Sequence, residues 1–262
     1  MGNNTNNLKV SVVQTPIIWE DPEANRSLFS KKMEKLVEVD LIVLPEMFTS
    51  GFSMKAPELA EAMNGPTVKW MVQQGVLYDA AVCGSLMIKE NDNYYNRLVW
   101  AQPDGKLYWY DKRHLFRMGE EDKVFSSGKR RLIVHWRGWR ICPLICYDLR
   151  FPVFSRNRND YDLLLYVANW PASRRNVWRT LLTARAIENQ AFCIGINRIG
   201  IDGAELEYAG DSMVIDPKGS VLSDGGMDDV ILTATLDLQV LHAFREAFPV
   251  GLDGDDFILL QK

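Results

Sequence analysis

Cys146 is the residue best placed to do chemistry in this sequence. It ends the apolar run Ile141-Cys-Pro-Leu-Ile145, and a Tyr147-Asp-Leu-Arg150 turn follows, with Pro152 at the start of a predicted helix. Unpaired N–H groups and the helix dipole favour negative charge at such a place, so the thiol could be held there as a thiolate. The alternative is a small core residue, since free cysteine is among the most buried residue types.

Two other apolar runs also end at an ionisable side chain, Leu41-Ile-Val-Leu-Pro45 at Glu46 and Leu107-Tyr-Trp-Tyr-Asp111 at Lys112. Sites in open α/β sheets form at the carboxyl ends of strands. A thiol needs a base, which a carboxylate of raised pKa can supply. An ammonium can favour the thiolate and, with the N–H of Tyr147, stabilise an oxyanion. Each charged residue alone could simply mark where the chain meets water, but the set of three is more specific.

The elements that position these residues run through the chain without an internal repeat or a linker, which predicts one domain over residues 1–262, with 1–7 as a disordered lead-in. Apolar periodicity and turn signals predict strands and helices. The predicted strands are 8–14, 40–44, 81–88, 94–101, 106–111, 132–136, 140–146, 162–168, 192–197, 213–216 and 230–236. The predicted helices are 22–39, 67–78, 176–189 and 238–248.

The order of these elements predicts a layered α/β protein with mixed sheets. Helices alternate with strands early in the chain, whereas hairpin signals appear later, at Pro103-Asp-Gly105 and Arg137-Gly138. Neither a purely parallel nor a purely antiparallel sheet fits that order. Because there are too few helices to cover both faces of one large sheet, two sheets must pack together.

Composition excludes several classes of protein. The formal net charge of −4 argues against a nucleic-acid surface. No stretch approaches the roughly 20 apolar residues of a membrane helix, and the N-terminus lacks the features of a signal peptide. Cys142 and Cys146 lie about 13 Å apart on an extended strand, too far for a disulfide, so a reduced, cytoplasmic setting is expected. No histidine or cysteine cluster has metal-ligand spacing, so no metal or other cofactor is predicted.

Three segments resemble, in order and spacing, the motif blocks of the nitrilase superfamily of carbon–nitrogen hydrolases. They are Leu44-Pro-Glu-Met-Phe48, Tyr110-Asp-Lys-Arg-His-Leu-Phe116 and Leu144-Ile-Cys-Tyr-Asp-Leu-Arg-Phe-Pro152. The resemblance extends from Leu8 to about Leu236. It implies a four-layer α-β-β-α sandwich that forms a homodimer.

The resemblance also implies a catalytic triad, with Glu46 as general base, Lys112 as transition-state stabiliser and Cys146 as nucleophile. The family often has a second glutamate before a Phe-x-x-Gly. Here Phe125-Ser-Ser-Gly128 follows two glutamates. Glu121 has the matching spacing, while Glu120 and an exposed acidic loop remain the alternatives.

Within the superfamily, the flanking sequences are most similar to the ω-amidase branch: Glu46-Met-Phe-Thr-Ser-Gly-Phe52, Cys146-Tyr-Asp-Leu-Arg-Phe-Pro152 and Ala168-Asn-Trp-Pro171. True nitrilases usually carry Trp-Glu after the cysteine, so Tyr147-Asp148 favours an amide over a nitrile. The resemblance implies hydrolysis of ω-monoamides of 2-oxo dicarboxylic acids, such as 2-oxoglutaramate and 2-oxosuccinamate, to the 2-oxo acid and ammonia through a cysteine thioester.

Such a substrate carries a carboxylate, for which an arginine is the natural partner. Arg150, Arg174 and Arg175 are the candidates, although Arg150 could instead hold the helix that starts at Pro152. Phe52 and Trp170 are expected to wall the pocket, unless they belong to the core.

Three other functions stay open. One is another small-amide or N-carbamoyl hydrolase of the same superfamily. A second is a thiol hydrolase that uses His114 as its base. The third is a non-catalytic, dimeric binding protein of this fold.

Overall fold

Two six-stranded mixed sheets form the centre of the computed structural model, which describes residues 7–259. The first sheet has the spatial order β14 (Val230–Asp237), β1 (Asn7–Gln14), β2 (Leu41–Val43), β3 (Ala81–Glu90), β4 (Asn93–Ala101) and β5 (Leu107–Asp111). The second has the order β13 (Val221–Asp224), β12 (Met213–Ile215), β9 (Phe192–Asn197), β8 (Leu163–Ala168), β7 (Trp139–Ile145) and β6 (Val134–Trp136). A two-stranded ribbon pairs β10 (Ile199–Ile201) with β11 (Glu207–Ala209).

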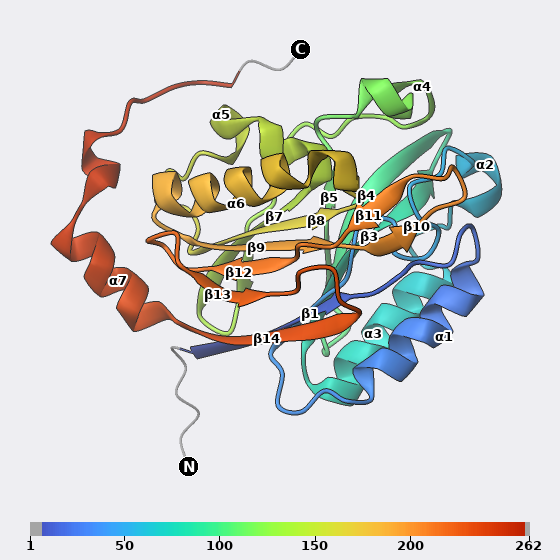
Figure 1. The fold of residues 1–262 in the computed structure, drawn as a ribbon, viewed down its shortest axis with the longest axis horizontal. Coiled ribbons are helices and arrows are strands. Elements are labelled where there is room, and N and C mark those ends of the chain that lie inside the picture. The colour runs from blue at the N-terminus through green and yellow to red at the C-terminus, as the bar shows by residue number, and fades with distance from the viewer. Residues whose placement is uncertain (1–6, 260–262) are drawn as a thin grey trace.

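Helices cover the outer face of each sheet, so the predicted α-β-β-α sandwich is confirmed (Figure 1). Helices α1 (Pro22–Met33) and α3 (Pro66–Tyr78) lie side by side on the first sheet. Helix α6 (Arg175–Asn189) covers the second sheet, with the short α5 (Pro152–Ser155) beside it. Helix α7 (Leu238–Ala247) follows β14 and leads into the C-terminal segment. The remaining short elements are α2 (Ala56–Leu59), α4 (Glu121–Val124) and the 3-10 turns Arg117–Gly119, Cys146–Arg150, Ala172–Arg174 and Val250–Asp253.

Strand β2 carries apolar side chains on both of its faces. Leu41 and Val43 pack in the layer between the two sheets, whereas Ile42 and Leu44 pack in the layer under α1 and α3. Successive side chains of a strand point to opposite faces, so a strand buried on both faces must be apolar throughout. The short strand is therefore fixed from both sides just before the chain reaches Glu46.

Turn chemistry explains the predicted hairpins. Arg137 and Gly138 both have left-handed backbone angles, with φ of 45° and 85°, and they join the antiparallel β6 and β7. Two positive φ angles are the signature of the type I′ turn that suits the twist of a hairpin. Gly105, with φ of 83°, lies in the turn between β4 and β5.

Some predicted boundaries are wrong. The first helix ends at Met33 instead of residue 39, because the chain turns there and passes through left-handed Glu38 (φ 49°) to enter β2. Asn7 belongs to β1, where it pairs with Asp237, and not to a lead-in; residues 1–6 of that predicted lead-in lie outside the described residues. Between residues 7 and 259, no helix is both long and apolar enough to cross a bilayer.

Candidate active site

Four ionisable side chains from both sheets meet at one end of the sandwich. Glu46 follows β2 and Lys112 follows β5 in the first sheet, whereas Cys146 directly follows β7 in the second. Glu121 begins α4, which lies in the loop after Lys112. The prediction that strand ends deliver a carboxylate, an ammonium and a thiol to one place therefore describes the geometry correctly.

Lys112 lies at the centre of this group. Its Nζ is 2.8 Å from Oε1 of Glu46, and 3.0 and 2.8 Å from Oε1 and Oε2 of Glu121. None of the three side chains has exposed surface. One ammonium thus bridges two buried carboxylates.

Burial and charge act in opposite directions on these groups. Burial alone would lower the pKa of Lys112, but the carboxylates of Glu121 and Glu46 outweigh it and raise that pKa. Burial raises the pKa of Glu121, with the charge of Glu46 adding to it and that of Lys112 opposing it. The lysine is therefore a permanent cation at neutral pH.

The backbone of Lys112 is held by a close approach of Gly128. The Gly128 N–H donates to the carbonyl of Lys112 at 2.9 Å. A Cβ at position 128 would lie 2.0 Å from the carbonyl oxygen of Asp111, so only glycine fits. This contact gives the predicted Phe-x-x-Gly segment a physical role beside the lysine.

Cys146 lies at the floor of the site in a strained conformation. Its φ is 41°, a left-handed value that is uncommon for a residue with a Cβ. The residue is 9% exposed, and its Sγ lies 3.9 Å from the carbonyl oxygen of Asn169. Sites of backbone strain are typical of functional residues whose surroundings over-determine their geometry.

The surroundings of Cys146 oppose the thiolate that a helix start alone would favour. Burial, followed by the charge of Glu46, raises the pKa of this thiol well above its ordinary value, and Lys112 opposes the shift only in part. These effects favour the neutral thiol of Cys146 over the thiolate.

Two asparagines complete the site, and sequence reasoning missed the role of both. Asn96 of β4 donates from Nδ2 to Glu46 at 2.8 Å and to Glu121 at 2.9 Å. Asn169 directly follows β8, and its N–H donates to Oε2 of Glu46 at 2.8 Å. The strand-end rule that identified Cys146 would also have found Asn169.

A cavity of about 630 Å³ opens above the thiol. All five residues predicted to contact substrate line it: Phe52, Tyr147, Arg150, Trp170 and Arg174. Sequence reasoning did not identify Trp19 and Tyr208, which also form its wall. Their segments are distant in sequence from the three motif blocks, so no motif marked them.

The three arginines considered as partners for a substrate carboxylate differ in their contacts. The guanidinium of Arg150 lies over the ring of Trp170 at 5.0 Å, and that of Arg174 lies over Phe116 at 5.4 Å. Within residues 7–259, neither forms an ion pair with a carboxylate. Arg175 is outside the cavity, and both sides of its guanidinium bind Asp211 at 2.9 Å.

Glu120 and His114, which were alternatives in the sequence, lie outside the group formed by Glu46, Lys112, Glu121 and Cys146. Glu120 is exposed and pairs with Lys123, whereas its neighbour Glu121 points inward to Lys112. His114 does not line the active-site cavity. Its Nδ1 is bound to Asp148 at 2.7 Å, so that nitrogen is not available to act as a base.

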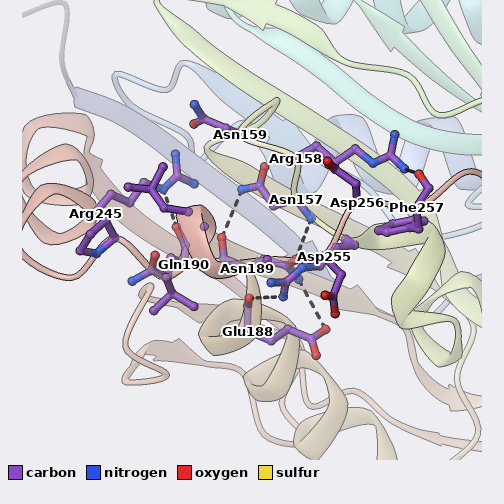
Figure 2. A pocket seen from close by; sticks show the side chains of 16 residues that line it. Asn157, Arg158, Asn159, Glu188, Asn189, Gln190, Arg245, Asp255, Asp256 and Phe257 are labelled. Carbon is purple, nitrogen blue, oxygen red and sulfur yellow. Dashed lines mark hydrogen bonds between the residues drawn. The ribbon is translucent and has the colours of Figure 1, made fainter.

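A second cavity, of about 350 Å³, lies under the C-terminal segment and contains none of the predicted site residues (Figure 2). Its arginines are already bound. Arg245 pairs with Asp162, Arg158 donates to the carbonyl of Phe257, and Arg156 donates to the carbonyl of Glu188. In the described part of the chain, no group of three or more His, Cys, Asp or Glu residues is arranged to hold a metal ion.

An α-β-β-α sandwich that brings a glutamate, a lysine and a cysteine together from three strand ends has the architecture of the nitrilase superfamily. The family model described as carbon-nitrogen hydrolase matches residues 9–246. The chain belongs to this carbon–nitrogen hydrolase family, and it is an amidase-type enzyme.

The chain is similar to named relatives over nearly its whole length. It is 47% identical over 253 residues to Omega-amidase YafV of Escherichia coli (strain K12), which covers 96% of this chain and 98% of that protein. It is 34% identical over 251 residues to 2-oxoglutaramate amidase of Bacillus subtilis (strain 168), covering 92% and 95% of the two chains.

A solved structure is similar as well. XC1258 from Xanthomonas campestris, a CN-hydrolase superfamily protein with an arsenic adduct in its active site, has a TM-score of 0.95 and 48% sequence identity. The match covers 97% of this chain and 99% of that chain.

Proposed function

We propose that this protein is an ω-amidase that hydrolyses the terminal amide of 2-oxoglutaramate and 2-oxosuccinamate to the 2-oxo acid and ammonia. One observation carries the proposal: the thiol of Cys146 lies beside Glu46 and Lys112 at the floor of a cavity that two arginines line. The names of the relatives, an omega-amidase and a 2-oxoglutaramate amidase, support the same substrate class.

In the first half of the reaction, Glu46 takes the thiol proton while Sγ of Cys146 attacks the amide carbon. The negative charge that develops on the amide oxygen lies between the ammonium of Lys112 and the N–H of Tyr147. Tyr147 is the second residue of a 3-10 turn, where N–H groups lack a partner within the turn. Glu46 then passes its proton to the leaving nitrogen, ammonia departs, and a thioester remains on Cys146.

In the second half, a water molecule attacks the thioester. Glu46 takes a proton from this water, and the second oxyanion is stabilised by the same two donors. When the intermediate collapses, the carbon–sulfur bond breaks, the 2-oxo acid is released and the proton returns from Glu46 to the sulfur. The roles of Glu46 and Lys112 depend on Glu121 and Asn96, which hold both in place.

The carboxylate of the substrate fits at the arginines of the cavity. Arg150 and Arg174 each rest on an aromatic ring, so the planar guanidinium is oriented while its N–H groups stay available. No side-chain hydrogen bond from Arg150 to α5 occurs in residues 7–259, so the structure gives no support for a helix-holding role. We therefore assign the carboxylate to these two arginines together.

The test is hydrolysis of a panel of amides by the wild-type protein and by Cys146→Ala. Ammonia release from 2-oxoglutaramate and 2-oxosuccinamate should greatly exceed release from glutamine, carbamoyl-β-alanine and simple aliphatic amides, and Cys146→Ala should abolish it. Mass spectrometry of acid-quenched enzyme should detect an acyl group on Cys146 that hydroxylamine removes. A preference for the N-carbamoyl compound would favour the related hydrolase, and no acyl adduct with any amide would favour a binding protein.

We further propose that the protein is a cytoplasmic homodimer. All four cysteines are free and buried, which suits a reducing compartment. Val153 on α5 and Ile187 on α6 are each more than half exposed on the same helical layer, and apolar side chains of that kind favour burial against a second copy. Light scattering should give about twice the 30.0 kDa mass of one chain; a monomer mass would contradict the dimer.

A further inference from the structure

Asp148, two residues after Cys146, is a fully buried carboxylate that accepts four hydrogen bonds. Its Oδ1 accepts from the backbone N–H of His114 at 3.1 Å and from the ring Nδ1 of the same residue at 2.7 Å. Its Oδ2 accepts from the hydroxyl of Tyr110 at 2.8 Å and from the N–H of Ile145 at 3.0 Å. A carboxylate can only accept, so the proton of the histidine ring lies on Nδ1.

These four donors join the two segments that carry the chemistry. Tyr110 and His114 lie two residues before and two residues after Lys112, and the other donor is the residue directly before Cys146. We propose that His114 and Asp148 are a pair of positioning residues, which hold the turn of Cys146 in register with the strand end that presents Lys112. The inference rests on the proposed function of this site.

Aromatic packing strengthens the same link. The ring of His114 stacks on Phe151 at 3.7 Å with an interplanar angle of 7°. Phe151 in turn meets the ring of Tyr147 edge-on at 5.2 Å, and Tyr147 meets Phe116 at 5.1 Å. Phe116 donates its N–H to Glu121 at 2.6 Å. The histidine is therefore connected to the predicted oxyanion donor and to the carboxylate that holds Lys112.

The conformation of Cys146 explains why such a link is needed. A non-glycine residue at φ 41° is strained and persists only where its neighbours hold it. Asp148 accepts a hydrogen bond from the N–H of Ile145, the residue directly before Cys146. Asp148 itself belongs to the 3-10 turn that begins at Cys146. A misplacement of about 1 Å at a reacting atom can cost about a hundredfold in rate.

Two substitutions of His114 separate the hydrogen bond from the stacking. His114→Phe keeps a ring on Phe151 but removes the donor to Asp148, whereas His114→Asn places an amide N–H near the position of Nδ1. We expect His114→Phe to lower kcat for 2-oxoglutaramate between about tenfold and a hundredfold with KM changed less than about threefold. His114→Asn should recover most of kcat. The rate of Cys146 alkylation by iodoacetamide should follow the same order.

The matched controls are His242→Phe and His242→Asn, because His242 is exposed on α7 and far from the turn in sequence; both should behave as wild type. Full activity in His114→Phe, equal losses in both His114 variants, or a change in KM alone would overturn the proposal. If His114→Phe does not fold, Tyr110→Phe removes a hydrogen bond to the other oxygen of Asp148, and the same loss of kcat is expected. If the proposed substrate class is wrong, the wild-type protein will not hydrolyse 2-oxoglutaramate. Alkylation of Cys146 needs no substrate, so the alkylation rates of the His114 variants would still test the positioning role.

Discussion

Both carboxylate oxygens of Glu121 accept hydrogen bonds from Nζ of Lys112, at 3.0 and 2.8 Å, and neither side chain has exposed surface. An ammonium held in this way cannot turn toward water when a substrate enters. The same Nζ also donates to Glu46, and its charge acts on the thiol of Cys146. The second glutamate therefore orients the cation, as the oxyanion-stabilising role proposed for Lys112 requires.

Replacing Glu121 with glutamine should lower kcat about a hundredfold. The glutamine amide would present N–H groups to the ammonium and to the N–H of Phe116, which now both donate to Glu121. Glu120→Gln is the matched control, since Glu120 is the adjacent residue and is exposed. Steady-state ammonia release measures the effect; equal activity of the two variants would rule out the orienting role.

Alkylation of Cys146 should report a thiol of raised pKa. Because burial and the charge of Glu46 disfavour the thiolate, the thiol stays protonated through neutral pH. The rate of reaction with iodoacetamide should therefore keep rising with pH up to about 9, without a plateau near neutrality. Peptide mapping should find the label on Cys146 alone, since the other three cysteines have no exposed surface. A plateau below pH 8 would show that the free enzyme holds a thiolate.

Arg150→Gln and Arg174→Gln should each raise KM for 2-oxoglutaramate by about ten- to a hundredfold while kcat changes little. Each substitution removes a cation from the cavity but leaves the groups around Cys146 untouched. A simple aliphatic amide, which lacks the carboxylate, should show no difference between variant and wild type. Arg117→Gln serves as the control because this exposed arginine does not line the cavity. Equal effects on charged and neutral amides would reject the carboxylate assignment.

Asp162→Asn should destabilise the protein by about 3–5 kcal/mol at pH 7, because the buried carboxylate binds both Arg140 and Arg245. Burial alone would raise the pKa of Asp162, but the two arginines outweigh it and lower that pKa. A folded-state pKa below the unfolded value gives stability that is complete above about pH 4 and is lost as the pH falls. Urea unfolding should show the gap between variant and wild type at pH 7 and a shrinking gap below pH 4. A gap that is constant with pH would contradict this source of stability.

The sequence predicted that Glu46, Lys112 and Cys146 would meet because they obey a simple rule of position. Glu46, Lys112 and Cys146 each follow an apolar run, and the layers of a mixed α/β sandwich bring such ends together. Asn96 obeys no such rule. It lies within β4, and its role appears only when β4 is placed beside Glu46 and Glu121, which a single sequence does not reveal.

The ionisation of the thiol could not be predicted for a related reason. From the sequence, the helix start and Lys112 both favoured a thiolate at Cys146. The structure adds burial and two carboxylates around the same sulfur, and these reverse the direction of the pKa shift. Short or exposed strands were missed as well: β10 and β11 have three residues each, and β13 lacks a buried face to create alternation.

The site draws Glu46 and Lys112 from one sheet and Cys146 from the other, so neither half of the sandwich can hold it alone. The apolar layer between the sheets joins segments that are distant in the chain, and such contacts form late because the loops between them must first close. A partly folded chain would then carry a buried base without its thiol, or a thiol without its base. Only the finished fold therefore places the base, the cation and the thiol together.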